Sequence, residues 1–148
     1  CLSRGLGDVY KRQVHAQMAR IEQRQLRVDN QVDASQQLLG ERFLLRQALG
    51  NLLDNALDFT PPGGLIRFAC EADDESLQLR LFNQGPAIPD YAMARLTERF
   101  YSLARPATGR KSTGLGLNFV QEVAQLHGAS LSIANVEGGV EVCLRFAR

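Results

Sequence analysis

The sequence predicts an α+β fold, a two-layer α/β sandwich in which one sheet carries helices on one face. Three observations favour this class. A long pattern of helical period occupies the first half of the chain, two pairs of alternating segments are typical of β-hairpins, and a second amphipathic pattern separates these pairs. The 148 residues suffice for one domain with a buried core.

The composition is that of an ordinary globular domain, with 45% hydrophobic and 22% charged residues. A net charge of +1 gives no reason to expect a nucleic-acid partner, and no apolar stretch approaches the roughly 20 residues of a membrane span. Cys1, Cys70 and Cys143 are odd in number and lack metal-site spacing, which suits a reducing compartment.

The first residues differ from the rest of the chain. Residues 3–13, SRGLGDVYKRQ, show no hydrophobic period, and residues 8–13 match the translation of a transposon-based sequencing adapter. We therefore expect residues 1–13 to be a library artefact. Residues 14–148 would then be the native domain, a C-terminal piece of a longer protein.

The first half of the domain is predicted to contain two helices and a strand. Residues 14–23 have the spacing of a short amphipathic helix, and residues 25–30 alternate as in a strand. The long helix lies within 36–59, begins near Glu41, and ends at the TPPGG turn of 60–64. Its apolar side comprises Leu45, Leu49, Leu52, Ala56 and Phe59.

Alternating segments at 65–71 and 77–83 predict a hairpin, with Leu77, Leu79 and Leu81 on one face. A turn follows, and then a short helix over 91–100.

Residues 101–113 form a long polar loop, a length that usually marks a lid or a binding loop. A helix over 115–127 ends at Gly128. Segments 129–135 and 139–146 predict the closing hairpin. Its inward side chains are Val140, Val142, Leu144 and Phe146.

Two glycines, Gly114 and Gly116, lie at the beginning of that last helix, in KSTGLGL. Glycine lets a ligand approach the backbone, and phosphates bind at helix N-termini. A flexible entry turn is the alternative. The stretch is not a Walker A loop, because Arg110 stands where glycine must precede the lysine, and it lacks the third glycine of a dinucleotide fingerprint.

Asn51 and Asn55 are four residues apart and share a face of the long helix, beside Asp54 and Asp58. One interpretation is a solvated stripe opposite the core. The other is a set of oxygen ligands for a hard cation such as Mg²⁺, which accompanies phosphates.

Four segments in this order carry a resemblance: NLLDNA (51–56), NQGPAIP (83–89), ERFY (98–101) and GLGL (114–117). They resemble the N, G1, F and G2 boxes of the ATP-binding catalytic domain of sensor histidine kinases, within the GHKL ATPase superfamily. The resemblance covers about residues 14–146. It implies the Bergerat fold, with a mixed, mostly antiparallel sheet, and it implies ATP and Mg²⁺ as cofactors.

The resemblance also implies roles for particular residues. Asn55 would bind Mg²⁺, Asn51 would hold the phosphates, and Phe59 would pack on the adenine. Phe100 would anchor an ATP lid formed by residues 101–113. The residues expected to bind ATP are Asn51, Asn55, Phe59, Asn83, Gly85, Ala87, Ile88, Phe100, Arg105, Arg110, Lys111, Ser112, Thr113, Gly114, Leu115, Gly116 and Leu117.

Three positions depart from the family pattern. Asn83 replaces an aspartate that accepts a hydrogen bond from adenine, Ala87 replaces a glycine, and Asp58 stands where many relatives have a basic residue. A degenerate domain that senses nucleotide or only binds partners is therefore the alternative function. An ATP-hydrolysing chaperone-like domain is disfavoured, because Asn51 is an amide where those relatives have a water-activating carboxylate.

The two histidines lack the motif of a phosphoacceptor. His15 is expected on a helix surface and His127 at a helix end, and both are interpreted as structural. The resemblance implies a phosphoacceptor histidine on a separate dimerisation domain, a cognate response regulator and a homodimeric parent protein. It implies a cytoplasmic domain without membrane contact, in a sensor of the inner membrane.

Overall fold

The computed structural model describes residues 4–32, 37–38, 40–103 and 115–147. The elements along the described chain are β1 (Arg4–Gly5), α1 (Leu6–Ala16), α2 (Met18–Gln23), β2 (Arg27–Gln31), β3 (Gln37–Leu38), α3 (Arg42–Phe59), β4 (Leu65–Ala72), β5 (Ser76–Gln84), α4 (Asp90–Met93), α5 (Gly116–Leu126), β6 (Ala129–Val136) and β7 (Gly139–Ala147).

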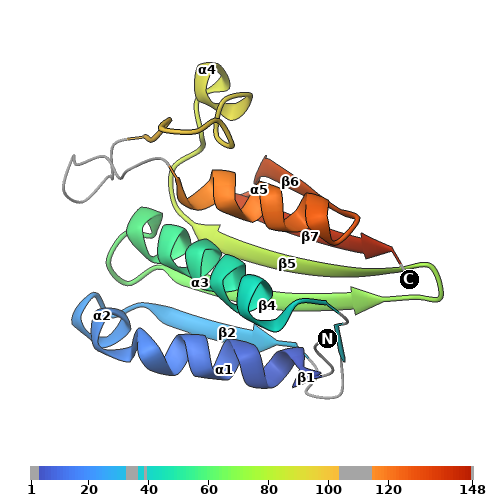
Figure 1. Cartoon of the computed structure of the whole chain (residues 1–148). Coiled ribbons are helices and arrows are strands. Elements are labelled where there is room, and N and C mark those ends of the chain that lie inside the picture. The colour runs from blue at the N-terminus through green and yellow to red at the C-terminus, as the bar shows by residue number, and fades with distance from the viewer. Residues whose placement is uncertain (1–3, 33–36, 39, 104–114, 148) are drawn as a thin grey trace.

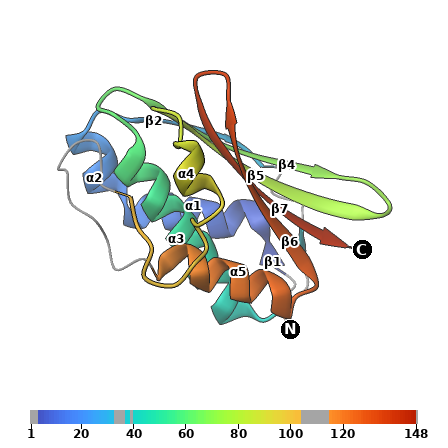
Figure 2. The same cartoon turned by 90° about the horizontal axis from the view of Figure 1, so that it is seen from above.

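The main sheet has the strand order β2-β4-β5-β7-β6. Strands β2 and β4 are parallel, and the other three neighbouring pairs are antiparallel. Helices α1, α2, α3 and α5 lie on one face of this sheet, as Figures 1 and 2 show from two directions. The predicted two-layer α+β sandwich with a mixed, mostly antiparallel sheet is confirmed.

The core lies between α3, α5 and the inner face of the sheet. Strands β4 and β5 bury every second side chain, since successive side chains point to opposite faces. The largest fully buried side chains are Phe68, Leu53, Leu57, Ile66, Leu77, Val120 and Thr60. The predicted apolar side of α3 is buried at Leu45, Leu49, Leu52 and Ala56, whereas Phe59 is half-buried.

Both ends of α3 are held by side chains. At the N-terminus the Glu41 carboxylate accepts from the Leu44 N–H at 2.6 Å, which satisfies one of the unpaired amides of the first turn. At the C-terminus Arg24 donates to the carbonyls of Leu57 and Thr60, the latter at 2.6 Å. Cations stabilise helix C-termini, so this end of α3 is fixed.

His127 joins the end of α5 to the beginning of α3. Its Nε2 accepts from the Glu41 N–H at 2.9 Å, and its Nδ1 lies 2.7 Å from the Val123 carbonyl. Both ring nitrogens are engaged in the folded domain, which supports the structural interpretation of this histidine.

Two predicted helices differ in length from the observed ones. The helix expected over 14–23 is interrupted at Gln17, and α1 extends back to Leu6 through residues expected to be an artefact. The helix expected over 91–100 ends at Met93. Beyond it, the Arg95 N–H bonds to Ala92 and the Glu98 N–H to Arg95, so the chain continues as successive turns.

Within the described residues, no helix is long and apolar enough to span a membrane.

Candidate functional site

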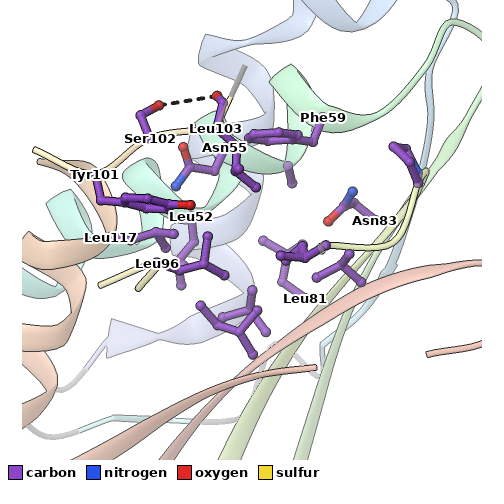
Figure 3. A pocket seen from close by; sticks show the side chains of 17 residues that line it. Leu52, Asn55, Phe59, Leu81, Asn83, Leu96, Tyr101, Ser102, Leu103 and Leu117 are labelled. Atoms are coloured by element: carbon purple, nitrogen blue, oxygen red, sulfur yellow. Dashed lines mark hydrogen bonds between the residues drawn. The ribbon is translucent and has the colours of Figure 1, made fainter. Parts of the chain in front are cut away.

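A pocket lies between the C-terminal half of α3, the beginning of α5 and the inner face of β5, β6 and β7 (Figure 3). It holds about 810 Å³ of space, counting its opening to solvent. The pocket is partly open to solvent, so a ligand can reach its walls from the surface.

Most of the pocket wall is apolar. Leu81, Val140 and Val142 come from alternating positions of the paired strands β5 and β7. Leu52 and Ala56 face them from α3. A flat ring can lie between these walls, because both sides offer aliphatic surface.

Asn83 brings a polar group to this apolar end. It is 7% exposed and lies near the end of β5, opposite Val140. Its side-chain amide has no hydrogen-bond partner within the described part of the chain. The amide lines the pocket, so its oxygen and nitrogen are available to a polar ligand.

The backbone on both sides of Asn83 is closely packed. A Cβ on Gly139, in the paired strand β7, would lie 2.1 Å from the Asn83 carbonyl oxygen. Gly85 has φ +156°, and a Cβ there would lie 2.9 Å from the Phe59 carbonyl oxygen. These two glycines let β5 approach β7 and the end of α3, which fixes where Asn83 enters the pocket.

The polar end of the pocket is formed by α3 and the first turn of α5. Asn55 and Gly116 both line it, and a Cβ on Gly116 would have one neighbour within 4 Å, the Asn55 Nδ2 at 3.9 Å. A side chain at Gly116 would thus occupy pocket space beside a helix N-terminus, where phosphates bind. The residues present therefore fit a bound triphosphate.

Asn51 lies one turn before Asn55 and does not line the pocket. Its Nδ2 donates to the Gly116 carbonyl at 3.4 Å, and its Oδ1 accepts from Gln47 at 3.2 Å. In this structure Asn51 connects α3 to α5. Its expected contact with phosphates stays a prediction.

The described side chains at the polar end are too few to bind Mg²⁺ alone, so phosphate oxygens of a bound ligand would have to supply further metal ligands. Among the described residues, no three His, Cys, Asp or Glu side chains converge on a common point. Mg²⁺ commonly binds through one or two protein oxygens, substrate phosphates and waters. The Asn55 side-chain oxygen is suited to be such a single protein ligand.

The charge of Asp58 is offset by an arginine from another helix. Arg20 of α2 bonds to Asp54 and to Asp58, each at 2.5 Å. The side chains of Arg20 and Asp58 are 36% and 26% exposed, so this ion pair is partly shielded from water. The acidic residue that departs from the family pattern is therefore paired.

Not all predicted site residues meet at the pocket. Those that line it are Asn55, Phe59, Asn83, Ile88, Gly116 and Leu117. Those described but not lining it are Asn51, Gly85, Ala87, Phe100 and Leu115. Arg105, Arg110, Lys111, Ser112, Thr113 and Gly114 lie outside the described residues.

The structure places Phe100 outside the pocket, and its expected role as the anchor of a lid stays a prediction. Phe100 is 72% exposed and has φ +66°, with the Arg99 guanidinium 5.6 Å from its ring. The next residue, Tyr101, lines the pocket instead, and Arg95 stacks on it at 4.5 Å. Phe100 has a left-handed backbone conformation, and it is Tyr101, not Phe100, that lines the pocket.

Several lining residues were missed as site residues. Leu81, Val140 and Val142 were predicted as inward-facing core, and Ile133 lies on the neighbouring strand. The alternation predicted which face of the strands they lie on, but it carries no signal for where the core ends and the pocket begins. Tyr101, Ser102 and Leu103 also line the pocket, and Ser102 Oγ donates to the Leu103 carbonyl at 3.3 Å (Figure 3).

The sandwich, and a pocket between its helices and the end of its sheet, define a nucleotide-binding domain of the kind found in sensor histidine kinases. The chain belongs to the family of histidine kinase-, DNA gyrase B- and HSP90-like ATPases, whose model matches residues 40–148.

Sensor protein CreC of Escherichia coli (strain K12) is 55% identical over 109 residues, which make up 73% of this chain and 23% of CreC. The chain thus spans about a quarter of this relative.

Solved structures agree on the fold. The nucleotide-free catalytic domain of histidine kinase ThkA has a TM-score of 0.86 at 21% identity, covering 99% of this chain and 96% of that one. ThkA in complex with response regulator protein TrrA gives 0.81 at 20% identity, covering 99% and 41%. Full-length ShkA in complex with AMPPNP gives 0.78 at 20% identity, covering 98% and 30%.

Proposed function

We propose that this domain binds Mg-ATP and donates the γ-phosphate to a histidine on a separate dimerisation domain. The observation that carries the proposal is the two-ended pocket. The Asn83 amide, which makes no hydrogen bond within the described chain, lies at the apolar end, and Asn55 beside the N-terminus of α5 lies at the polar end.

Each end suits one part of the nucleotide. The base would lie between Phe59 and the aliphatic residues of β5 and β7, with its polar edge toward Asn83. The phosphates would approach Gly116, where the first amides of α5 are unpaired. Asn55 would bind the Mg²⁺ that accompanies them.

The residues around the phosphates favour transfer over hydrolysis. Asn51 stands one turn before the proposed metal ligand, and an amide cannot accept a proton from water at neutral pH. Its amide also bonds to Gly116 and Gln47. The nucleophile would therefore come from another domain.

The partners of the proposed kinase are the dimerisation domain of the same parent protein and a response regulator. The two engaged ring nitrogens of His127 and the lack of a phosphoacceptor motif around His15 support an acceptor histidine elsewhere. The complex of ThkA with TrrA supports a response regulator as a partner. We place the domain on the cytoplasmic side of an inner-membrane, homodimeric sensor.

A second candidate is a degenerate domain that binds nucleotide without transferring phosphate. The observation in its favour is Asn83 in place of a charged acceptor, whereas the charge of Asp58 is offset by Arg20. Ala87 is exposed and does not line the pocket, so this departure does not obstruct ligand entry.

Two measurements separate these candidates. Calorimetric titration with Mg-ATP should show saturable binding that weakens when Mg²⁺ is chelated. Radiolabelled ATP should then transfer phosphate to a purified dimerisation domain of the parent. Binding without transfer would favour the degenerate domain, and the absence of binding would overturn both.

A further inference from the structure

The side-chain amide of Asn83 is positioned to read the polar edge of a base. Figure 3 shows it turned toward the interior of the pocket, below Phe59. The residue is 7% exposed, and neither its oxygen nor its nitrogen has a hydrogen-bond partner in the described ranges. Both atoms are therefore available to pair with a ligand edge that carries a donor beside an acceptor.

An amide differs from a carboxylate in the patterns that it can match. It presents an acceptor oxygen beside donor N–H groups, whereas an ionised carboxylate only accepts. Turning the amide by a half rotation about its last bond exchanges the oxygen and the nitrogen. No described hydrogen bond holds Asn83 in either orientation, so both are available to a ligand.

The two purine bases present these two patterns. On its Watson–Crick edge adenine carries the N6 amino donor next to the N1 acceptor, the same donor–acceptor pattern that asparagine pairs with at N6 and N7 in DNA. Guanine carries a carbonyl acceptor next to a ring N–H donor at the corresponding positions. One orientation of the amide suits adenine and the other suits guanine.

Several described neighbours of Asn83 add no preference between the bases. Leu81, Val140 and Val142 are apolar. The main chain of Ile88 is already used, because its N–H donates to Asn135 Oδ1 at 2.8 Å and its carbonyl accepts from Asn135 Nδ2 at 3.0 Å. The Gly85 N–H is bonded to Gly138.

Resting on the proposed nucleotide-binding function, we propose that Asn83 lets this pocket accept guanine as well as adenine nucleotides. Asn83 is then the residue that sets base specificity. A carboxylate at this position, as in the family pattern that the sequence resembles, would face the guanine carbonyl and repel it.

The test is calorimetric titration of the whole chain with Mg-ATP, Mg-GTP and Mg-ITP. ATP and GTP should bind with dissociation constants within about tenfold of each other, since each base makes two neutral hydrogen bonds to the amide. ITP has the same edge as GTP without its 2-amino group, so it should bind within about tenfold of GTP.

Asn83→Asp should raise the ATP-to-GTP affinity ratio at least about tenfold, because adenine gains a charged acceptor while guanine meets a like partial charge. Asn83→Ala, which removes both groups without adding charge, should weaken both nucleotides equally. The matched control is Asn30→Asp, which adds the same charge at an exposed position of β2 and should leave the ratio unchanged. Circular dichroism checks that each variant folds.

A wild-type preference for ATP above about tenfold, or loss of ITP binding with GTP retained, would overturn the inference. So would an equal ratio in wild type and Asn83→Asp, unequal losses in Asn83→Ala, or a shift caused by Asn30→Asp. ATP binding without GTP binding would leave the proposed function standing. The absence of all nucleotide binding would overturn the proposed function and this inference together.

Discussion

Two asparagines one turn apart on α3 have different surroundings. Asn55 lines the pocket, whereas Asn51 bonds to the Gly116 carbonyl and to Gln47. Both were expected at the site from their spacing and from the N-box resemblance. Spacing alone could not separate them, because the difference depends on where α5 begins, 65 residues along the chain from Asn51.

Asn55→Ala should abolish the Mg²⁺ dependence of nucleotide binding and leave the fold intact. The change removes one oxygen from a hard-cation site without opening a cavity in the core. The measurement is the dissociation constant of ATP with and without Mg²⁺. Asn51→Ala is the matched control: it should lower the free energy of unfolding by about 1 kcal/mol and keep the Mg²⁺ dependence. Equal Mg²⁺ dependence in Asn55→Ala and wild type would refute the metal assignment.

A second prediction at this scale concerns Asp73, in the turn between β4 and β5. Its carboxylate accepts from the N–H groups of Ser76 at 2.7 Å and Glu75 at 2.8 Å. These hydrogen bonds, first that from Ser76, lower the pKa of Asp73 below its ordinary value. The carboxylate therefore stabilises the folded chain above the unfolded pKa of about 3.9, and this contribution is lost as the pH falls through the folded pKa.

Asp73→Asn keeps an acceptor oxygen that does not titrate. Wild type should consequently lose more thermal stability than Asp73→Asn between about pH 5 and pH 3, where the other carboxylates titrate in both proteins. Parallel melting-temperature profiles would show that the turn does not depend on the Asp73 charge.

At the scale of elements, hydrophobic period predicted most of the structure. The strands alternate as expected, and α3 and α5 begin and end within a residue or two of the expected positions. The break at Gln17 was missed because neither glycine nor proline marks it. The bonds from Arg20 and Arg24 to the C-terminal half of α3 were also missed. They join residues 33–38 positions apart, so the local sequence carries no signal for them.

Arg24→Met should lower the free energy of unfolding by about 1.5–3 kcal/mol. The variant keeps the aliphatic part of the side chain but leaves the Leu57 and Thr60 carbonyls without their charged donor. Urea denaturation measures the loss, and Arg24→Lys should recover part of it. If Arg24→Met is as stable as wild type, these carbonyls are satisfied by water and the Arg24 hydrogen bonds contribute nothing to the free energy of unfolding.

At the scale of the whole molecule, α1 lies against α3 on the side away from the pocket. The Gln13 side chain donates to the Arg46 carbonyl at 3.2 Å, and Val9 is buried in the core at 8% exposure. Residues 1–13 therefore contribute to packing in this structure, whatever the origin of their codons.

Deleting residues 1–13 should cost about 1.5–3 kcal/mol of stability, the free energy of burying one aliphatic side chain. It should change the ATP dissociation constant less than about twofold, since no residue of α1 lines the pocket. Denaturation and calorimetry on the same truncated chain measure both. A large loss of ATP affinity with unchanged stability would show that residues 1–13 support nucleotide binding and not the stability of the fold.

The close approach of Gly139 to Asn83 has a genetic consequence. Gly139 follows a hairpin turn more than fifty positions from Asn83, and any larger residue there would collide with the Asn83 carbonyl. A random screen for lost nucleotide binding should recover alleles at codon 139 alongside those in the motifs. Second-site suppressors should then appear in β5, where a small backbone shift restores the path of the strand.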